Sequence, residues 1–108
     1  TFILAAKNTV PKLFQSKKKT VGIRVPDNLI PKMIVEVLGN PIMTASVYDT
    51  NQVLEYTVDP SLIHEQYSSQ VEIVIDGGPG GIEGSTVIDC SKGDFEVIRE
   101  GKGSIEDF

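Results

Sequence analysis

Hydrophobic and polar residues alternate with a period of two in several short stretches, and this pattern predicts β-strands. We expect strands over residues 1–6 and 20–26. The sequence therefore starts within a strand. Further along, the same pattern predicts a buried strand over 71–76 that runs into a glycine-rich loop. The remaining predicted strands are short and lie at residues 41–46, 85–90 and 95–100.

Apolar residues at helical spacing predict an amphipathic helix over 29–38, with its apolar stripe packed in the core. The stripe consists of Leu29, Ile30, Met33, Ile34, Val37 and Leu38. Gly39 is suited to end this helix in the left-handed conformation. Asp59 and Pro60 are typical first residues of a second helix that reaches about Tyr67. Residues 49–57 show no clear pattern and are interpreted as a loop over a site or at the surface.

These elements predict an α/β fold with a twisted mixed sheet and helices packed on it. Strands 85–90 and 95–100 are separated by a turn at residues 91–94, so we expect them to form an antiparallel hairpin. The length of 108 residues corresponds to one domain. With 40% hydrophobic residues and 23% charged residues, the composition is that of an ordinary globular protein.

Five glycines lie within residues 77–84, and so many flexible residues need a reason because each one costs backbone entropy. One interpretation is that backbone N–H groups approach an anion or nucleotide, with hydroxyls added by Ser85 and Thr86. The other is a wide hairpin loop that requires positive φ angles. No Gly-Lys-Ser/Thr follows, which excludes a Walker loop, and the segment that follows is a strand, which excludes a Rossmann fingerprint.

The single cysteine, Cys90, allows no internal disulfide and favours a reducing, cytoplasmic location. It lies in a strand pattern and is interpreted as an inert thiol. With one cysteine and one histidine, His64, the sequence predicts no metal site. The longest apolar run is far shorter than a membrane helix requires, so no membrane partner is expected.

The net charge of −5 is unevenly distributed, because residues 1–54 hold seven Lys/Arg and three Asp/Glu. An acidic chain argues against avid non-specific nucleic-acid binding, but the basic half could face a phosphate-bearing ligand. Lys17, Lys18 and Lys19 form either a solvated turn or a basic rim that faces phosphate or RNA. Arg24 forms either a structural ion pair or a bidentate contact with a carboxylate or phosphate.

Four motifs along the chain resemble the YrdC/YciO family, which includes the L-threonylcarbamoyladenylate synthases. They are KKKTVGIRVPDN (17–28), LGNPIMTAS (38–46), IDGGPGGIEGSTVID (75–89) and VIREG (97–101). The resemblance covers essentially all 108 residues. Domains of this family are about twice as long, so it implies that residues 1–108 are the C-terminal half of such an α/β domain and that the N-terminal half is absent.

The resemblance implies a role in joining L-threonine, bicarbonate and ATP into threonylcarbamoyl-AMP for tRNA modification. ATP, with or without Mg²⁺, would be a substrate, and no tightly bound cofactor is expected. The catalytic residues are not assigned. The residues implied in nucleotide or substrate binding are Arg24, Ser46, Ser85, Thr86 and Arg99. For Arg99, an exposed charge at the edge of the sheet is the alternative.

The chain departs from the synthase pattern in two ways. Family synthases carry Ser-x-Asn where this chain has Ser46 and Tyr48, and in this the chain resembles the YciO branch. The Lys-x-Arg motif of the N-terminal half is not in this chain, so we expect no catalysis by the chain alone.

Two alternatives to a synthase domain remain open. The first is a non-catalytic nucleotide- or RNA-binding module of the YciO type, in which Lys17, Lys18 and Lys19 face double-stranded RNA or tRNA. The second is a structural fragment whose exposed sheet edge pairs with a missing half or with a second copy in a homodimer.

Overall fold

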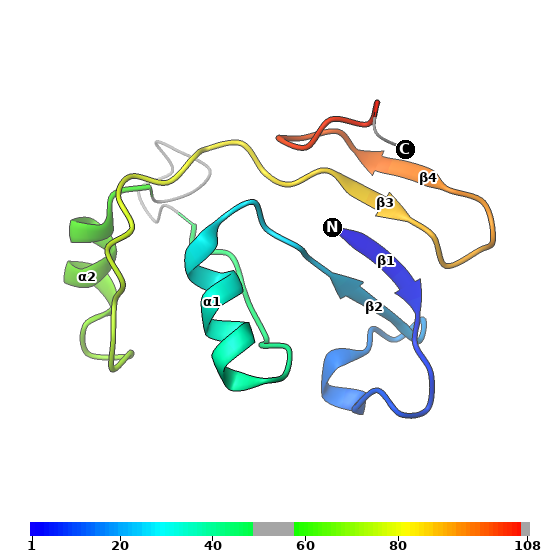
Figure 1. Cartoon of the computed structure of the whole chain (residues 1–108), viewed down its shortest axis with the longest axis horizontal. Helices are drawn as coiled ribbons and strands as arrows, with labels where there is room; N and C mark the ends of the chain where they lie inside the picture. The colour runs from blue at the N-terminus through cyan, green and yellow to red at the C-terminus, as the bar shows by residue number, and fades with distance from the viewer. Residues whose placement is uncertain (49–57, 107–108) are drawn as a thin grey trace. The chain divides into compact units, whose positions relative to one another are not determined.

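A mixed sheet forms the centre of the first of two compact units in the computed structural model, which describes residues 1–48 and 58–106. The first unit comprises Thr1–Met43 and Glu83–Phe108, and the second comprises Thr44–Ile82. The strand order is β2-β1-β3-β4 (Figure 1). The strands are β1 (Phe2–Ala5), β2 (Thr20–Ile23), β3 (Val87–Asp89) and β4 (Glu96–Arg99).

Both parallel and antiparallel pairings hold this sheet together. β1 is antiparallel to β2 and parallel to β3, and β3 is antiparallel to β4. The predicted mixed sheet and the predicted hairpin of the last two strands are therefore confirmed. The predicted strand over 20–26 ends earlier, at Ile23.

The register divides the sheet into two faces. Phe2 pairs with Ile23 on one side and with Ile88 on the other, and Ile88 pairs with Val97. Because paired residues point to the same side of a sheet, one face is lined by apolar side chains alone. This apolar sheet face consists of Phe2, Leu4, Val21, Ile23, Ile88 and Val97.

Both predicted helices are present, with the predicted ends. In α1 (Leu29–Leu38), the Oδ1 of Asn28 accepts a hydrogen bond from the Ile30 N–H at 2.9 Å, and Gly39 ends the helix with a φ of 81°. α2 (Pro60–Tyr67) belongs to the second unit, and the Oδ1 of Asp59 accepts from the Ser61 N–H at 2.8 Å. A 3₁₀ turn, η1 (Lys12–Phe14), precedes β2. None of the helices in the described residues is long and apolar enough to cross a membrane.

The predicted burial of the α1 stripe is wrong for this chain. Val37 is 88% exposed, and Leu29, Met33, Ile34 and Leu38 are exposed as well. In the part of the chain that the structure describes, the extensive contacts between elements are those between neighbouring strands. The stripe therefore has an amphipathic pattern but no core to pack in.

Two predicted strands are not formed in the described residues. Residues 41–46 carry no strand, and neither do residues 71–76, where Ile73 is 76% exposed. A strand needs a neighbour that supplies ladder hydrogen bonds, and alternation alone does not provide one. The glycine-rich stretch that follows is consequently not a hairpin loop. The loop predicted over residues 49–57 lies outside the described residues.

Candidate functional site

A hydrogen-bonded pair, Ser85 and Arg99, lies where β3 begins and β4 ends. The Nε of Arg99 donates to the backbone oxygen of Ser85 at 2.9 Å, and its Nη2 donates to the Ser85 Oγ at 3.4 Å. The antiparallel hairpin brings the two residues together, because Val87 pairs with Arg99. The sequence placed both residues in a ligand site by resemblance, and the structure brings them into contact.

Gly84 provides the space in which the guanidinium of Arg99 lies. A Cβ atom at Gly84 would be 2.9 Å from Nη2 and 3.0 Å from Cζ of Arg99. Both distances are shorter than an ordinary van der Waals contact. Any residue with a Cβ atom at position 84 would therefore displace the guanidinium of Arg99. Sequence analysis missed this role, although Gly84 stands directly before the Ser-Thr pair of the motif.

The start of β1 lies against the same pair, as the N label beside β3 in Figure 1 shows. The Oγ1 of Thr1 is 2.8 Å from the Oγ of Ser85, and the nitrogen of Thr1 donates to the Thr86 carbonyl at 2.7 Å. Burial lowers the pKa of the Thr1 α-amino group, and the positive charges of Arg24 and Arg99 lower it further. Both arginines are therefore within electrostatic reach of Thr1.

Arg24 lies near the start of β1 because β2 runs antiparallel to β1. Phe2 pairs with Ile23, so the residue after Ile23 lies next to the start of β1. Alternation places Arg24 on the face opposite the apolar sheet face. Ser85 lies on that opposite face as well, because it precedes Val87 by two residues. Arg24 thus lies on the same face as Ser85 and Arg99, on the other side of β1 and with no hydrogen bond to either. We call these three residues the arginine–serine cluster.

The two guanidinium groups of this cluster lack carboxylate partners among the described residues. Arg24 is exposed and has no hydrogen-bond or ion-pair partner there, so the structural ion pair that was one of its two interpretations is not seen among the described residues. Arg99 bonds only to Ser85 in that part of the chain. Guanidinium forks bind carboxylates and phosphates through paired N–H groups. The cluster is thus chemically suited to hold an oxyanion, with the Ser85 hydroxyl as a further hydrogen-bonding group.

Thr86 is engaged inside the protein, in contrast to its predicted role in ligand binding. It is 6% exposed, and its hydroxyl donates to the carbonyl of Gly103. The same Oγ1 accepts from the Gly101 N–H at 3.0 Å. Alternation also points this side chain away from the face that carries Ser85. Thr86 holds the segment after β4 in place, and we do not include it in the candidate site.

Ser46 and the first four glycines of the glycine-rich stretch, Gly77, Gly78, Gly80 and Gly81, belong to the second unit. Ser46 is exposed. In the stretch, the Gly78 N–H donates to the Asp76 carboxylate at 2.9 Å, and the Gly80 N–H donates to the Val58 carbonyl at 2.8 Å. These two amides are therefore not available to an anion, and a carboxylate already occupies the turn. For the other N–H groups of the stretch, the interpretation as an anion cradle stays a prediction.

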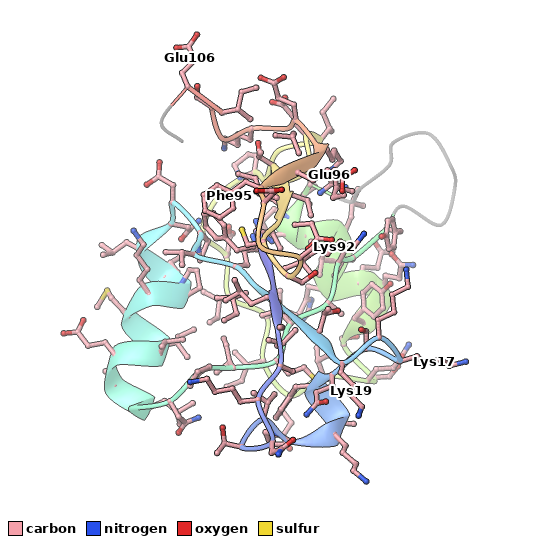
Figure 2. The ribbon with its side chains drawn as sticks, turned by 90° about the vertical axis from the view of Figure 1, so that its right-hand side faces the viewer. Lys17, Lys19, Lys92, Phe95, Glu96 and Glu106 are labelled. Carbon is pink, nitrogen blue, oxygen red and sulfur yellow. The ribbon has the colours of Figure 1, made fainter. Side chains whose placement is uncertain are left out.

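The three lysines lie at the opposite end of the sheet from the arginine–serine cluster. Ala5, at the end of β1, pairs with Thr20, which directly follows Lys19. Lys19 has a φ of 56° and its N–H donates to the Ser16 carbonyl at 3.0 Å, as in a tight turn. The side chains of Lys17 and Lys19 extend away from the ribbon (Figure 2). The basic run is thus an exposed turn, and it does not extend the cluster into one continuous surface.

Asp89 lies at this same end, and its pKa depends on Ser91. The Ser91 Oγ donates to the Asp89 Oδ1 at 2.6 Å, and the Ser91 N–H donates to the same oxygen at 2.8 Å. These two hydrogen bonds lower the pKa of Asp89, with smaller contributions from Lys92 and Lys18. The lowered pKa stabilises the fold at pH values above the ordinary value of 3.8, and this contribution is lost as the pH falls through the lowered value.

The substitution Ser91→Ala is expected to raise the pKa of Asp89 toward 3.8, because it removes the larger of the two hydrogen bonds. The pKa is measured by following the Asp89 side-chain carboxyl carbon by NMR as the pH is lowered. Ser104→Ala is the control, because the Ser104 hydroxyl accepts from Glu106 and has no contact with Asp89. An unchanged pKa in Ser91→Ala would show that this hydrogen bond does not form in solution.

Comparisons with known proteins place the chain in a family. A family model that is named for Sua5, YciO and YrdC, and described as telomere recombination, matches residues 1–101. The chain belongs to the Sua5/YciO/YrdC family. It is 39% identical over 110 residues to the uncharacterized protein YciO of Escherichia coli K12, with 100% of this chain and 52% of that protein covered.

Other members of the family show the same pattern of coverage. An uncharacterized protein of Haemophilus influenzae is 39% identical over 109 residues, and the chain covers 53% of it. The crystal structure of E. coli YciO superposes on 99% of this chain with a TM-score of 0.85 and 35% identity, and 52% of that structure's chain is covered. The chain thus spans about half the length of the curated relatives it matches. That this half is the C-terminal one stays a prediction.

Enzymes of the family are more distant. The threonylcarbamoyl-AMP synthase of Mus musculus is 28% identical over 109 residues, which cover 94% of this chain and 38% of that protein. The higher identity to YciO agrees with the resemblance to the YciO branch that Tyr48 suggested. Tyr48 itself is exposed and belongs to the second unit with Ser46.

Proposed function

We propose that this chain supplies one side of a site for ATP and L-threonine in a domain of the threonylcarbamoyl-AMP synthase type. The chain would correspond to the C-terminal half of such a domain. The observation that carries the proposal is the arginine–serine cluster, in which Arg24 and Arg99 have no carboxylate partner among the described residues. Unneutralised guanidinium groups in a chain with a net charge of −5 favour an anionic ligand.

The proposed reaction converts L-threonine, bicarbonate and ATP into threonylcarbamoyl-AMP, pyrophosphate and water. Each reactant carries a carboxylate, bicarbonate or phosphate group and the leaving group is an anion, so positioning and charge stabilisation are the contributions that arginines can make. Arg24 and Arg99 would bind carboxylate or phosphate oxygens, and the Ser85 hydroxyl would add one hydrogen bond. No group of three or more His, Cys, Asp or Glu side chains in the described residues is placed to hold a metal ion. Any Mg²⁺ would arrive with the ATP phosphates.

The chain alone is expected to release no pyrophosphate from ATP in the presence of L-threonine and bicarbonate. It spans about half of its relatives, and a site built from two halves lacks the groups of the other half. A coupled pyrophosphate assay measures this directly, with a full-length family synthase as the positive control. Sustained release by the 108 residues would contradict the proposal that they supply only one side of the site.

The binding part of the proposal is tested by titrating the ¹⁵N-labelled chain with ATP and, separately, with L-threonine. We expect backbone amide shifts at Ser85 and Arg99, together with a shift of the Arg24 side-chain N–H signals. Shifts confined to Lys17–Lys19 would overturn the assignment of the cluster and favour the phosphate contacts of an RNA-binding module. The absence of shifts at millimolar ATP would remove ATP from the proposal.

A further inference from the structure

A β-bulge lies in β4, directly before Arg99. Ile88 pairs with Val97, but Val87, its neighbour in β3, pairs with Arg99. Ile98 is therefore an extra residue in β4, with no residue of β3 opposite it. A bulge sets two residues of one strand against one residue of the partner strand, and it changes the direction in which the following side chain points.

The bulge determines the face of the sheet on which Arg99 lies. Val97 belongs to the apolar sheet face, because it pairs with Ile88. In a regular strand, residues two apart share a face, so Arg99 would also lie on the apolar sheet face. The extra residue instead pairs Arg99 with Val87, on the opposite face. Ser85 lies on that face as well, and the Nε of Arg99 donates to its backbone oxygen at 2.9 Å.

The segment after β4 is fixed by the side chain of Thr86. Its hydroxyl accepts from the Gly101 N–H at 3.0 Å and donates to the Gly103 carbonyl. The Lys102 N–H, between these two glycines, donates to the Gly84 carbonyl at 2.9 Å. Thr86 is buried, and a buried hydroxyl needs its hydrogen-bond partners. We call these hydrogen bonds between residues 84–86 and 101–103 the Thr86 clamp.

The bulge and the Thr86 clamp lie on either side of Arg99 in the sequence. Ile98 directly precedes Arg99, and only Glu100 separates Arg99 from Gly101. A regular pairing of β3 with β4 would move Arg99 and the residues after it by one position relative to β3. The Gly101 N–H would then no longer face the Thr86 hydroxyl. The Thr86 clamp therefore stabilises the bulged register over the regular one.

We propose that Thr86 is a positioning residue for the anion site. Through the Thr86 clamp it keeps the bulge at Ile98, and the bulge holds the guanidinium of Arg99 beside Ser85. The anion is that of the proposed function, on which this role rests. Thr86 does not touch the anion itself, because its side chain points to the other face of the sheet. A guanidinium that is fixed before the anion arrives loses less conformational entropy on binding.

The positioning is tested by NMR in the ligand-free chain with Thr86→Val, which replaces the hydroxyl by a methyl group of similar size. We expect the Arg99 Nε–H to exchange with water about tenfold faster than in the unmodified chain, because its contact with Ser85 opens more often. Thr86→Ser keeps the hydroxyl and is expected to restore slow exchange. Unchanged Nε–H exchange in Thr86→Val would overturn the role of Thr86.

Thr20→Val is the matched control for the loss of a threonine hydroxyl. The Oγ1 of Thr20 lies 2.7 Å from the Oγ of Ser16, at the other end of the sheet from Arg99. This variant loses a hydroxyl hydrogen bond without touching the Thr86 clamp, so the exchange of the Arg99 Nε–H is expected to stay unchanged. Equal acceleration in Thr20→Val and Thr86→Val would show a general loss of stability and would contradict a positioning role.

A second measurement uses the unmodified chain and does not depend on whether Thr86→Val folds. Opening of the Thr86 clamp frees the Gly101 amide, and we expect the Arg99 Nε–H to become free in the same event. After correction for intrinsic exchange rates, the Nε–H should therefore be protected no more strongly than the Gly101 amide. An Nε–H protected about tenfold more strongly would show that Arg99 stays in place when the clamp opens, and would overturn the proposal.

Titration with ATP separates this role from the proposed function. We expect Thr86→Val to weaken ATP binding about fivefold, because the positive charge of Arg99 is kept but is no longer fixed in position, and Thr86→Ser to restore the affinity. Absence of ATP binding by the unmodified chain would remove the proposed function, while the exchange of the Arg99 Nε–H would still test the role of Thr86. Unchanged ATP affinity in a Thr86→Val chain whose Nε–H exchanges faster would overturn the link between positioning and binding.

Discussion

Replacing Gly101 with alanine is expected to lower the free energy of unfolding by about 1–3 kcal/mol, the usual cost of overpacking. A Cβ atom at Gly101 would overlap the carbonyl oxygen of Gly84 and would lie 2.8 Å from the carbonyl carbon of Ser85. Both of these atoms belong to the backbone, so no side chain can rotate to make room. The clash falls where the Lys102 N–H donates to the Gly84 carbonyl at 2.9 Å.

The measurement is urea unfolding followed by far-ultraviolet circular dichroism. Gly22→Ala is the matched control, because a Cβ atom at Gly22 would meet no other atom within 4 Å. We expect its stability to change by less than about 0.5 kcal/mol, as for other surface substitutions. Equal stability of the two variants would mean that the segment after β4 does not dock against residues 84–86 in solution.

The sequence was sufficient to predict the elements whose signals are local. The ends of α1 and α2 followed from Asn28, Gly39 and the Asp59-Pro60 pair, because capping depends on residues within one turn of the helix end. The β3–β4 hairpin followed from the short turn between two alternating segments. Its register includes an irregularity between Val87 and Ile88, which no local pattern indicated.

Elements that depend on distant partners could not be predicted in the same way. The alternation over 71–76 is as regular as in β2, but β2 has β1 beside it and residues 71–76 have no strand partner in the described part of the chain. The α1 stripe was interpreted as buried because an apolar stripe normally packs in a core. The pattern shows which side chains are apolar enough to be buried, but it does not show which segment of a protein buries them.

The candidate site was predicted in part. Resemblance indicated Arg24, Ser85 and Arg99, and the structure brings Ser85 and Arg99 into contact, with Arg24 at the end of β2 on the other side of β1. It also indicated Thr86, whose hydroxyl is occupied by Gly101 and Gly103. The sequence could have predicted that Ser85 and Thr86 do not share a site, because neighbouring side chains in extended backbone point to opposite faces. The predicted role of Ser46 stays a prediction.

Replacing Arg99 with glutamine is expected to weaken ATP binding about 10- to 100-fold, if the cluster binds the nucleotide as proposed. A hydrogen bond to a charged group contributes about 1.5–3 kcal/mol, and 1.4 kcal/mol corresponds to about tenfold in affinity. The fork of Arg99 also holds the Ser85 backbone and hydroxyl. The loss is measured by amide-shift titration with ATP at a fixed ionic strength of about 0.15 M, where screening limits the reach of distant charges.

Lys92→Gln is the control for the change of net charge. Lys92 lies in the turn between β3 and β4, at the other end of the sheet, and its removal takes the same positive charge from the chain (Figure 2). Since a charge at that distance is largely screened, we expect less than a threefold loss in this variant. Arg99→Lys keeps the charge and loses the planar fork, so its affinity should lie between those of Arg99→Gln and the unmodified chain. Equal losses of ATP affinity in Arg99→Gln and Lys92→Gln would show that ATP affinity depends only on the net charge of the chain. That result would contradict the assignment of the arginine–serine cluster as the binding site.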